Sequence, residues 1–281
     1  MKKKVLAVVL CVAMLAIAVV GGSLAYFTDT DAAQNVMTVG NVAIVQDEQQ
    51  KVIGEEVDDA EVNSKYVIKE NDNLETFEQN KKLFPMVDNR EDKTANPVVD
   101  GYFDGRMANV VDKIVTVSND GSEDAYVRTI IAFETATEYV ENTATVRRDG
   151  KEIFNTYIGT LKGKGFQWLE RNTVKVNGTE YVVGVLVYDE ALAPGATSHP
   201  SLKQFFLSPE ADNEVSLMFG TEYNILAVSQ AVQTAGFEPV KDADGNVTKT
   251  AAAVALDAAF GNLETVDDTT LSEWLNAAQY G

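Results

Sequence analysis

The chain consists mainly of short apolar runs separated by glycine-containing turns, and this pattern restricts the folds that it can adopt. Asn177-Gly178 lies between Thr173–Lys175 and the apolar run Tyr181–Tyr188, and Asp244-Gly245 marks a second turn. Asn-Gly and Asp-Gly readily take the positive φ angles that tight hairpins require. Many short strands and few helices are typical of an all-β fold. We therefore expect a jelly roll or β-sandwich with a few short helices and long loop insertions.

The same patterns place individual elements along the chain. Tyr181–Tyr188 is apolar at successive positions, which predicts a central strand covered on both faces. Leu202–Leu207 predicts one helical turn, Ala251–Phe260 a helix or a small-residue strand, and Leu271–Ala278 a helix capped by Thr269 or Thr270. Further strands are predicted at Met37–Val45, at Ile114–Ser118 and Ala125–Glu134 around the turn Asn119–Gly121, at Thr145–Arg147 and Glu152–Phe154 around Asp149-Gly150, and at Glu214–Phe219 and Tyr223–Val232.

The first 25 residues have the layout of a secretory signal peptide. Three lysines, Lys2–Lys4, precede the apolar run Val5–Val20, and Ser23-Leu24-Ala25 offers the small residues that a signal peptidase recognises. We expect cleavage between Ala25 and Tyr26. An uncleaved anchor is the alternative, because the 21 uncharged residues from 5 to 25 are enough to span a bilayer. In either case the remainder of the chain is exported.

The mature chain is expected to be a single domain of 256 residues, from 26 to 281. An irregular insertion is expected at about 46–109, where polar residues and two prolines interrupt the strand pattern. The only cysteine, Cys11, leaves with the signal, so a hydrophobic core rather than a disulfide must stabilise the fold.

The charge of the chain argues against nucleic acid as a partner. Removing the signal takes away three lysines and no acidic residue, which changes the formal net charge from −20 to −23. Such a surface repels phosphates and keeps a secreted protein soluble. It would also suit calcium or a basic partner, but a solvated acidic surface is the plainer explanation.

Residues for catalysis are scarce. The single histidine, His199, lies in a loop flanked by prolines, and no HExxH, GxSxG, P-loop or dinucleotide motif is present. The segment Asp242–Asn246 resembles a calcium loop but lacks the required glutamate, so we expect a hairpin turn there. Trp168 and Trp274 are expected to pack in the core or at its rim. We therefore expect no enzyme, no catalytic residue, no metal site and no cofactor.

Four short strings resemble one family of exported proteins. The signal and its end, Gly21–Asp29, are similar to the start of the TasA/camelysin proteins of Gram-positive bacteria. Asn119–Arg128 resembles the family's strand pair N-x-G-x-x-x-A-Y-V-R, and Leu192–Gly195 resembles its turn before the next strand. Ala231–Phe237 resembles its late strand end, A-[IV]-Q-x-x-G-F.

The resemblance implies a jelly-roll protein, released by a SipW-type signal peptidase, that forms biofilm matrix fibres outside the cell. In such fibres a freed N-terminal segment completes the sheet of the next subunit. Carried onto this chain, the donor segment runs from Tyr26 to about Gln34 and begins with Tyr26, Phe27, Thr28, Asp29 and Thr30. The implied partners are other copies of the chain in a head-to-tail polymer, the signal peptidase and possible accessory matrix proteins.

Three functions remain open at this point. The first is a structural subunit of matrix fibres or of the cell surface, assembled by strand addition. The second is a secreted metal-dependent peptidase, because the camelysin branch carries that label. The third is a monomeric surface adhesin or binding module, in which the inserted loops and Trp168 would matter.

Overall fold

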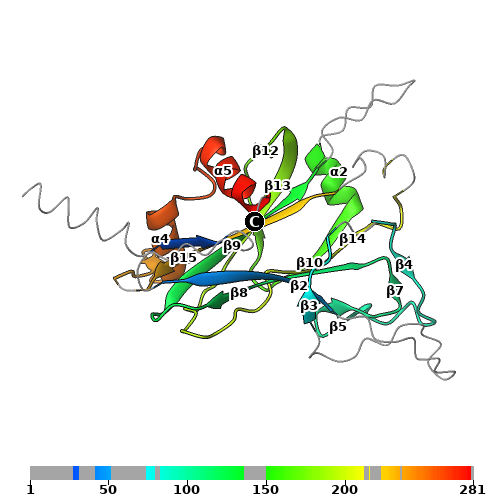
Figure 1. Ribbon diagram of the computed structural model, residues 1–281, viewed down its shortest axis with the longest axis horizontal. Coiled ribbons are helices and arrows are strands. Elements are labelled where there is room, and N and C mark those ends of the chain that lie inside the picture. The colour runs from blue at the N-terminus through cyan, green and yellow to red at the C-terminus, as the bar shows by residue number, and fades with distance from the viewer. Residues whose placement is uncertain are drawn as a thin grey trace, which may run out of the picture.

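The computed structural model describes residues 28–31, 42–51, 74–79, 83–135, 150–211, 215, 223–234 and 236–279. Within these residues the chain forms two antiparallel sheets that pack face to face (Figure 1). In the six-stranded first sheet, strands follow in the order β1 (Thr28–Asp31), β15 (Ile225–Gln233), β9 (Ala125–Glu134) and β13 (Thr179–Val187), and β13 also pairs with β11 (Gln167–Trp168) and β12 (Val174–Val176). The five-stranded second sheet has the order β10 (Ile158–Lys162), β14 (Leu202–Leu207), β8 (Val111–Asn119), β2 (Ile44–Lys51) and β3 (Leu74–Thr76). The expected all-β fold is confirmed.

The core lies between the two sheets and continues under a helix at one end. Side chains that alternate along the strands meet there, as in sandwiches generally. Ile131 and Phe133 of the first sheet pack with Val115 and Leu202 of the second. Helix α2 (Gly150–Tyr157) adds Ile153 and Phe154 to the same cluster.

The outer face of the first sheet is also buried, because two helices cover it (Figure 1). Helix α4 (Ala251–Phe260) places Ala255 and Leu256 against Val232 of β15. Helix α5 (Asp268–Gln279) packs Leu271 and Leu275 on the sheet, with Trp274 beside them. The prediction that β13 is covered on both faces is therefore confirmed, as is the helical form of Ala251–Phe260.

Several predicted elements are confirmed with small shifts of their ends. Asn177 and Gly178 have φ angles of 50° and 90° and join β12 to β13 in a tight hairpin. The strands predicted around Asn119–Gly121 are β8 and β9, but they belong to different sheets, so this turn crosses between the sheets and is not a hairpin. Helix α5 begins at Asp268, so the predicted cap at Thr269 or Thr270 was wrong. Asp267 caps the helix by accepting hydrogen bonds from the amide and hydroxyl of Thr270, both at 2.9 Å.

Two predicted elements were wrong, and a third ends later than expected. Leu202–Leu207 is a strand, β14, because β8 and β10 pair with its two edges. Glu152–Phe154 belongs to helix α2 and not to a hairpin, because Ile153, Phe154 and Tyr157 follow the spacing of one helical face. The strand predicted to end at Val45 continues as β2 from Ile44 to Lys51, into the expected insertion.

Some predictions lie outside the described residues. These are the signal, the beginning of the predicted first strand at residues 37–41, and Thr145–Arg147. Of the strand predicted at Glu214–Phe219, only Val215 is described, and its backbone is helical.

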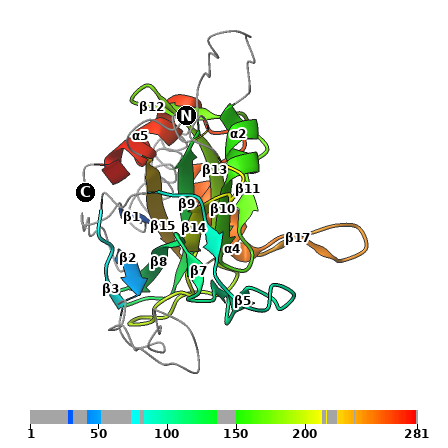
Figure 2. The same cartoon turned by 90° about the vertical axis from the view of Figure 1, so that its right-hand side faces the viewer.

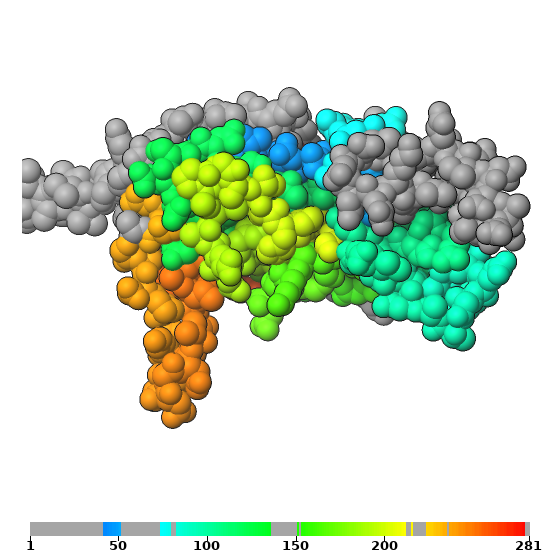
Figure 3. Space-filling view, turned by 90° about the horizontal axis from the view of Figure 1, so that it is seen from below, coloured from blue at the N-terminus to red at the C-terminus, as the bar shows by residue number. Residues whose placement is uncertain are grey.

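Two projections extend from the sandwich. The hairpin of β16 (Val240–Lys241) and β17 (Val247–Lys249) stands away from the body in Figures 2 and 3. Its turn is the predicted one: Asp242 accepts hydrogen bonds from the amides of Asp244 and Asn246. The second projection is formed by residues 83–109 of the insertion. It contains two short ribbons, one of β4 (Val87–Asp88) with β7 (Met107–Ala108) and one of β5 (Val98–Val99) with β6 (Tyr102–Phe103).

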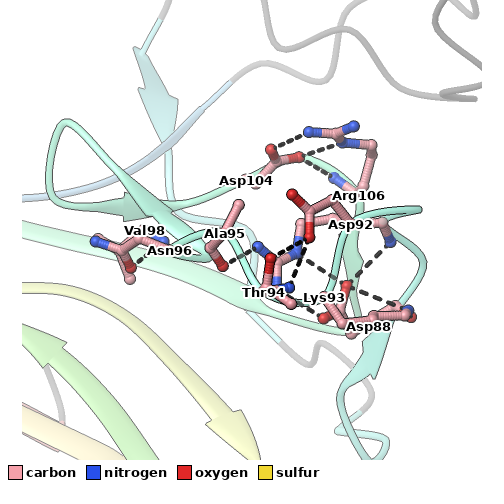
Figure 4. Close-up of polar contacts among 10 residues, drawn as sticks. Asp88, Asp92, Lys93, Thr94, Ala95, Asn96, Val98, Asp104 and Arg106 are labelled. Carbon is pink, nitrogen blue, oxygen red and sulfur yellow. Dashed lines mark hydrogen bonds and ion pairs between the residues drawn. The ribbon is translucent and has the colours of Figure 1, made fainter.

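Two local aspartate–arginine pairs order turns within the insertion (Figure 4). Arg90 donates through Nε and Nη2 to the two oxygens of Asp88, at 3.0 and 2.8 Å. Arg106 donates in the same way to Asp104, at 2.9 and 2.6 Å. The arginine hydrogen bonds hold the pKa of both carboxyl groups below its usual value. Gln204 of β14 then anchors the insertion by accepting a bond from the Phe103 amide.

The order of the insertion should therefore depend on pH. A carboxyl group whose pKa is lowered by folding stabilises the fold above its unfolded pKa, about 3.9 for aspartate, and loses that contribution as the pH falls below it. We expect the amide chemical shifts of Asn89 and Met107 to move toward unfolded values below about pH 4, while sandwich amides stay native. In the Asp88→Asn variant the change in these chemical shifts on acidification should be smaller, because the Asp88–Arg90 ion pair is already lost at neutral pH. Unchanged shifts down to pH 2.5 in the native chain would contradict this prediction.

Candidate functional site

The part of the predicted donor segment that is described forms the end strand of the first sheet (Figure 2). β1 pairs antiparallel with β15, so that Thr28 lies opposite Val232, Asp29 opposite Ala231, Thr30 opposite Gln230 and Asp31 opposite Ser229. Ala25, Tyr26 and Phe27 lie outside the described residues. The structure thus places Thr28, Asp29 and Thr30 together at one sheet edge.

β15 is a buried strand, although it lies next to the edge of its sheet. Every residue from Leu226 to Val232 is buried, on one face by the second sheet and on the other by α4 and α5. Its other edge pairs with β9. Backbone groups of such a strand need a hydrogen-bonding partner at the open edge, since unpaired groups beside a core are costly. In the structure β1 provides that partner.

A polar contact ties β15 to the second sheet on its inner face. Ser229 Oγ donates to Gln46 Oε1 at 2.6 Å, and Gln46 Nε2 donates to the carbonyl oxygen of Ala227 at 3.0 Å. Thr129 of β9 shares a 3.0 Å hydrogen bond with the Ser229 hydroxyl. This explains why β2 carries glutamines that the sequence pattern assigned to an insertion: Gln46 is buried and bonded across the sandwich.

An ion cluster lies on the outer face of the same strand pair, beneath α4. Arg128 of β9 is 1% exposed and donates from Nε to Gln230 Oε1 at 2.8 Å. Its Nη1 donates to Asp257 Oδ1 and to the carbonyl oxygen of Gly261, both at 3.2 Å. Lys249 donates to the other oxygen of Asp257 at 2.6 Å. We call Arg128, Gln230, Lys249 and Asp257 the Arg128 cluster.

The Arg128 cluster carries more positive than negative charge. Arg128 and Lys249 share one carboxylate, that of Asp257. Burial lowers the pKa of Arg128 to about 10, and the Asp257 carboxylate opposes that shift, so the guanidinium stays charged at neutral pH. Arg128 Nη2 and Gln230 Nε2 are buried and, among the described residues, have no hydrogen-bond partner. The cluster therefore has two donors and a net positive charge that an anionic oxygen would satisfy.

Sequence reasoning did not single out this cluster. Arg128 was noticed only as the last residue of the Ala125–Arg128 string, and Asp257 was part of an alanine-rich segment. The available signal was a lone charge in each apolar element: Arg128 in the run Ala125–Phe133, and Asp257 in Ala251–Phe260. Charged side chains in such places are almost always paired.

Other residues with chemical potential have structural contacts. His199 is exposed in its loop, and its ring lies against Tyr188 with centroids 5.0 Å apart. Trp168 is 36% exposed at the rim, with its ring 5.4 Å from Phe133 and from Phe154. Within the described ranges, no group of three or more histidine, cysteine or acidic side chains is placed to hold a metal ion.

A hollow of about 570 Å³ between α5 and the β12–β13 hairpin is lined mainly by polar side chains. Asn177 donates to Asn276 at 2.6 Å, and Ser272 donates to the carbonyl oxygen of Lys175 at 2.7 Å. These bonds fasten α5 to the hairpin.

No protein-family model, curated protein or solved structure matches the chain. The resemblance to the TasA/camelysin family therefore stays a prediction from its motifs. In the part of the chain that the structure describes, none of the helices has the length and apolar character needed to span a bilayer.

Proposed function

We propose that this chain is an exported, non-enzymatic structural protein, a subunit of a biofilm matrix fibre or of the cell surface, that assembles by strand addition. The observation that carries the proposal is the pairing of Thr28–Asp31 with the edge of β15, a strand otherwise buried on both faces. In the proposed assembly, Thr28–Asp31 leaves β15 of its own subunit and binds β15 of the next.

Such an exchange is physically inexpensive. The incoming strand has the same sequence as the strand that it replaces, so the backbone hydrogen bonds lost in one subunit are recovered in its neighbour. The contact is head-to-tail and joins two different surfaces. A contact of this kind propagates into a filament unless its rotation closes a ring. The signal peptidase that frees Tyr26 and possible accessory matrix proteins are the other partners of this proposal.

The second candidate is a monomeric surface adhesin or binding module. One observation favours it: β1 already completes the first sheet within a single chain. In that case the N-terminal segment would serve the fold alone, and exposed side chains such as Trp168 would provide the binding surface.

The deciding experiment compares the mature chain, Tyr26 to Gly281, with a chain that lacks residues 26–34. Sedimentation and negative-stain microscopy should show thin filaments for the mature chain and a folded monomer for the shortened one. A synthetic peptide of residues 26–34 should bind the shortened chain one to one, whereas a scrambled peptide should not. If the mature chain stays monomeric at every salt concentration and pH tried, the binding module becomes the leading function.

A further inference from the structure

We propose that the Arg128 cluster is a receptor for the carboxylate of Asp31 from a second copy of the chain, and that this contact sets the register of the exchanged strand. The inference rests on the proposed function and adds the side-chain chemistry by which β15 recognises an incoming strand.

The first reason is the pair of buried donors without partners. Arg128 Nη2 and Gln230 Nε2 both lack an acceptor among the described residues. Nε and Nη2 form one edge of a guanidinium group, and Nε already donates to Gln230, so Nη2 lies on the side nearest Gln230. A carboxylate has two oxygens and can accept one hydrogen bond from each of these donors. Leaving buried donors unsatisfied is costly, so an occupant of this chemistry is favoured.

The second reason is charge. Asp257 is the one carboxylate that contacts Arg128 and Lys249 in the described structure. The cluster therefore has one uncompensated positive charge beside a side chain that is 1% exposed. Electrostatic attraction is stronger in such a place than in water, which favours a second carboxylate over a neutral group.

The third reason is the alternation of threonine and aspartate in β1. In the structure Thr30 lies opposite Gln230, which in turn lies opposite Arg128. Successive residues of a strand alternate between the two faces of the sheet. A shift of the pairing by one residue therefore moves the aspartates to the face that the threonines occupied. One such shift places Asp31 opposite Gln230 and Thr28 opposite Gln233. The opposite shift is disfavoured, because it would set Asp31 against Val228, which is fully buried in the middle of β15.

A strand from a second copy is free to take this register. Within one subunit, residues 32–41 must connect Asp31 to Val42, whose side chain is fixed in the core between the sheets. A strand supplied by another subunit has no such connection to the β2 that lies beside it.

The register can be read by disulfide formation between two single-cysteine chains, because the mature chain has no cysteine of its own. A disulfide requires Cβ atoms about 4 Å apart. Thr28→Cys mixed with Gln233→Cys reports the proposed register, and Thr28→Cys mixed with Val232→Cys reports the register seen within the monomer. We expect oxidised filaments to give the cross-linked dimer predominantly from the first mixture.

If the filaments gave more cross-linked dimer from the second mixture, the inference about register would be overturned and the proposed function would stand. If neither filaments nor either cross-link formed, both the inference and the proposed function would be overturned.

The chemistry is tested with peptides of residues 26–34 that bind the chain lacking that segment. The Asp31→Asn peptide should bind roughly ten- to a hundredfold more weakly than the native peptide, as expected for loss of charge-assisted hydrogen bonds. Asp29→Asn is the matched control and should bind nearly as well as the native peptide. In a receptor chain that carries Gln230→Leu, the difference in affinity between the native and Asp31→Asn peptides should be smaller. Equal affinities of all three peptides for the native receptor would refute the role of Asp31.

Discussion

Replacing Asp257 by alanine is expected to lower the free energy of unfolding by about 3–5 kcal/mol, as measured by urea denaturation. The reason is that Arg128, 1% exposed, would keep its charge but lose its carboxylate. The Gly261 carbonyl and Gln230 would remain as acceptors, and neither carries the charge needed to balance a guanidinium. A loss of this size would make Asp257 one of the most important single side chains for stability.

Two further variants separate the cost of leaving a buried charge unpaired from the cost of losing the ion pair. Arg128→Met together with Asp257→Ala should recover much of the loss, because the unpaired charge is removed with its partner. Lys249→Ala should cost only up to about 1 kcal/mol, since that lysine is 35% exposed at the base of the projecting hairpin. If Asp257→Ala is no more harmful than Lys249→Ala, the carboxylate does not neutralise Arg128 in the way proposed.

Phe133→Ala should destabilise the fold by a similar amount, about 3–5 kcal/mol. Phe133 has no exposed surface and lies where the two sheets and α2 meet. Its ring centroid is 5.4 Å from those of Phe154 and Trp168, so truncation would leave a cavity bordered by rigid rings that cannot easily collapse. Fluorescence of Trp168 should shift on the same substitution.

A matched control is Phe84→Ala in the insertion, where the ring is 52% exposed. That substitution should change the free energy of unfolding by no more than about 0.5 kcal/mol. Comparable losses in the two variants would mean that the cluster around Phe133 is not the centre of the core.

The parts of the fold that were predictable are those determined by neighbouring residues. The β12–β13 hairpin needs only two residues that tolerate positive φ, and Asn177-Gly178 supplies them. Helix α4 follows from a run of alanines. By contrast, β14 was mistaken for a helical turn because its status depends on β8 and β10, whose residues are distant in the sequence. Local patterns cannot reveal which edges a segment will meet.

The candidate site likewise contains parts that neighbouring residues predict and parts that depend on contacts distant in the sequence. The donor segment was inferred from motifs near its own position, and the structure then places Thr28–Asp31 beside Ser229–Val232, some two hundred residues away. The pairing of Arg128 with Asp257 crosses 129 positions of sequence and is created only when α4 packs on the first sheet. The buried glutamine of β2 was misjudged because its polarity is satisfied by the opposite sheet.

The shortness of β1 has a consequence for the timing of assembly under the proposed exchange. Its four residues belong to the same chain as β15, so they compete with any incoming strand at an effective concentration in the millimolar range. A dilute subunit, newly exported, would therefore keep its own strand in place. Subunits crowded at the cell surface or at a filament end would exchange more readily. Once Tyr26 has been freed, local crowding would then determine where polymer grows.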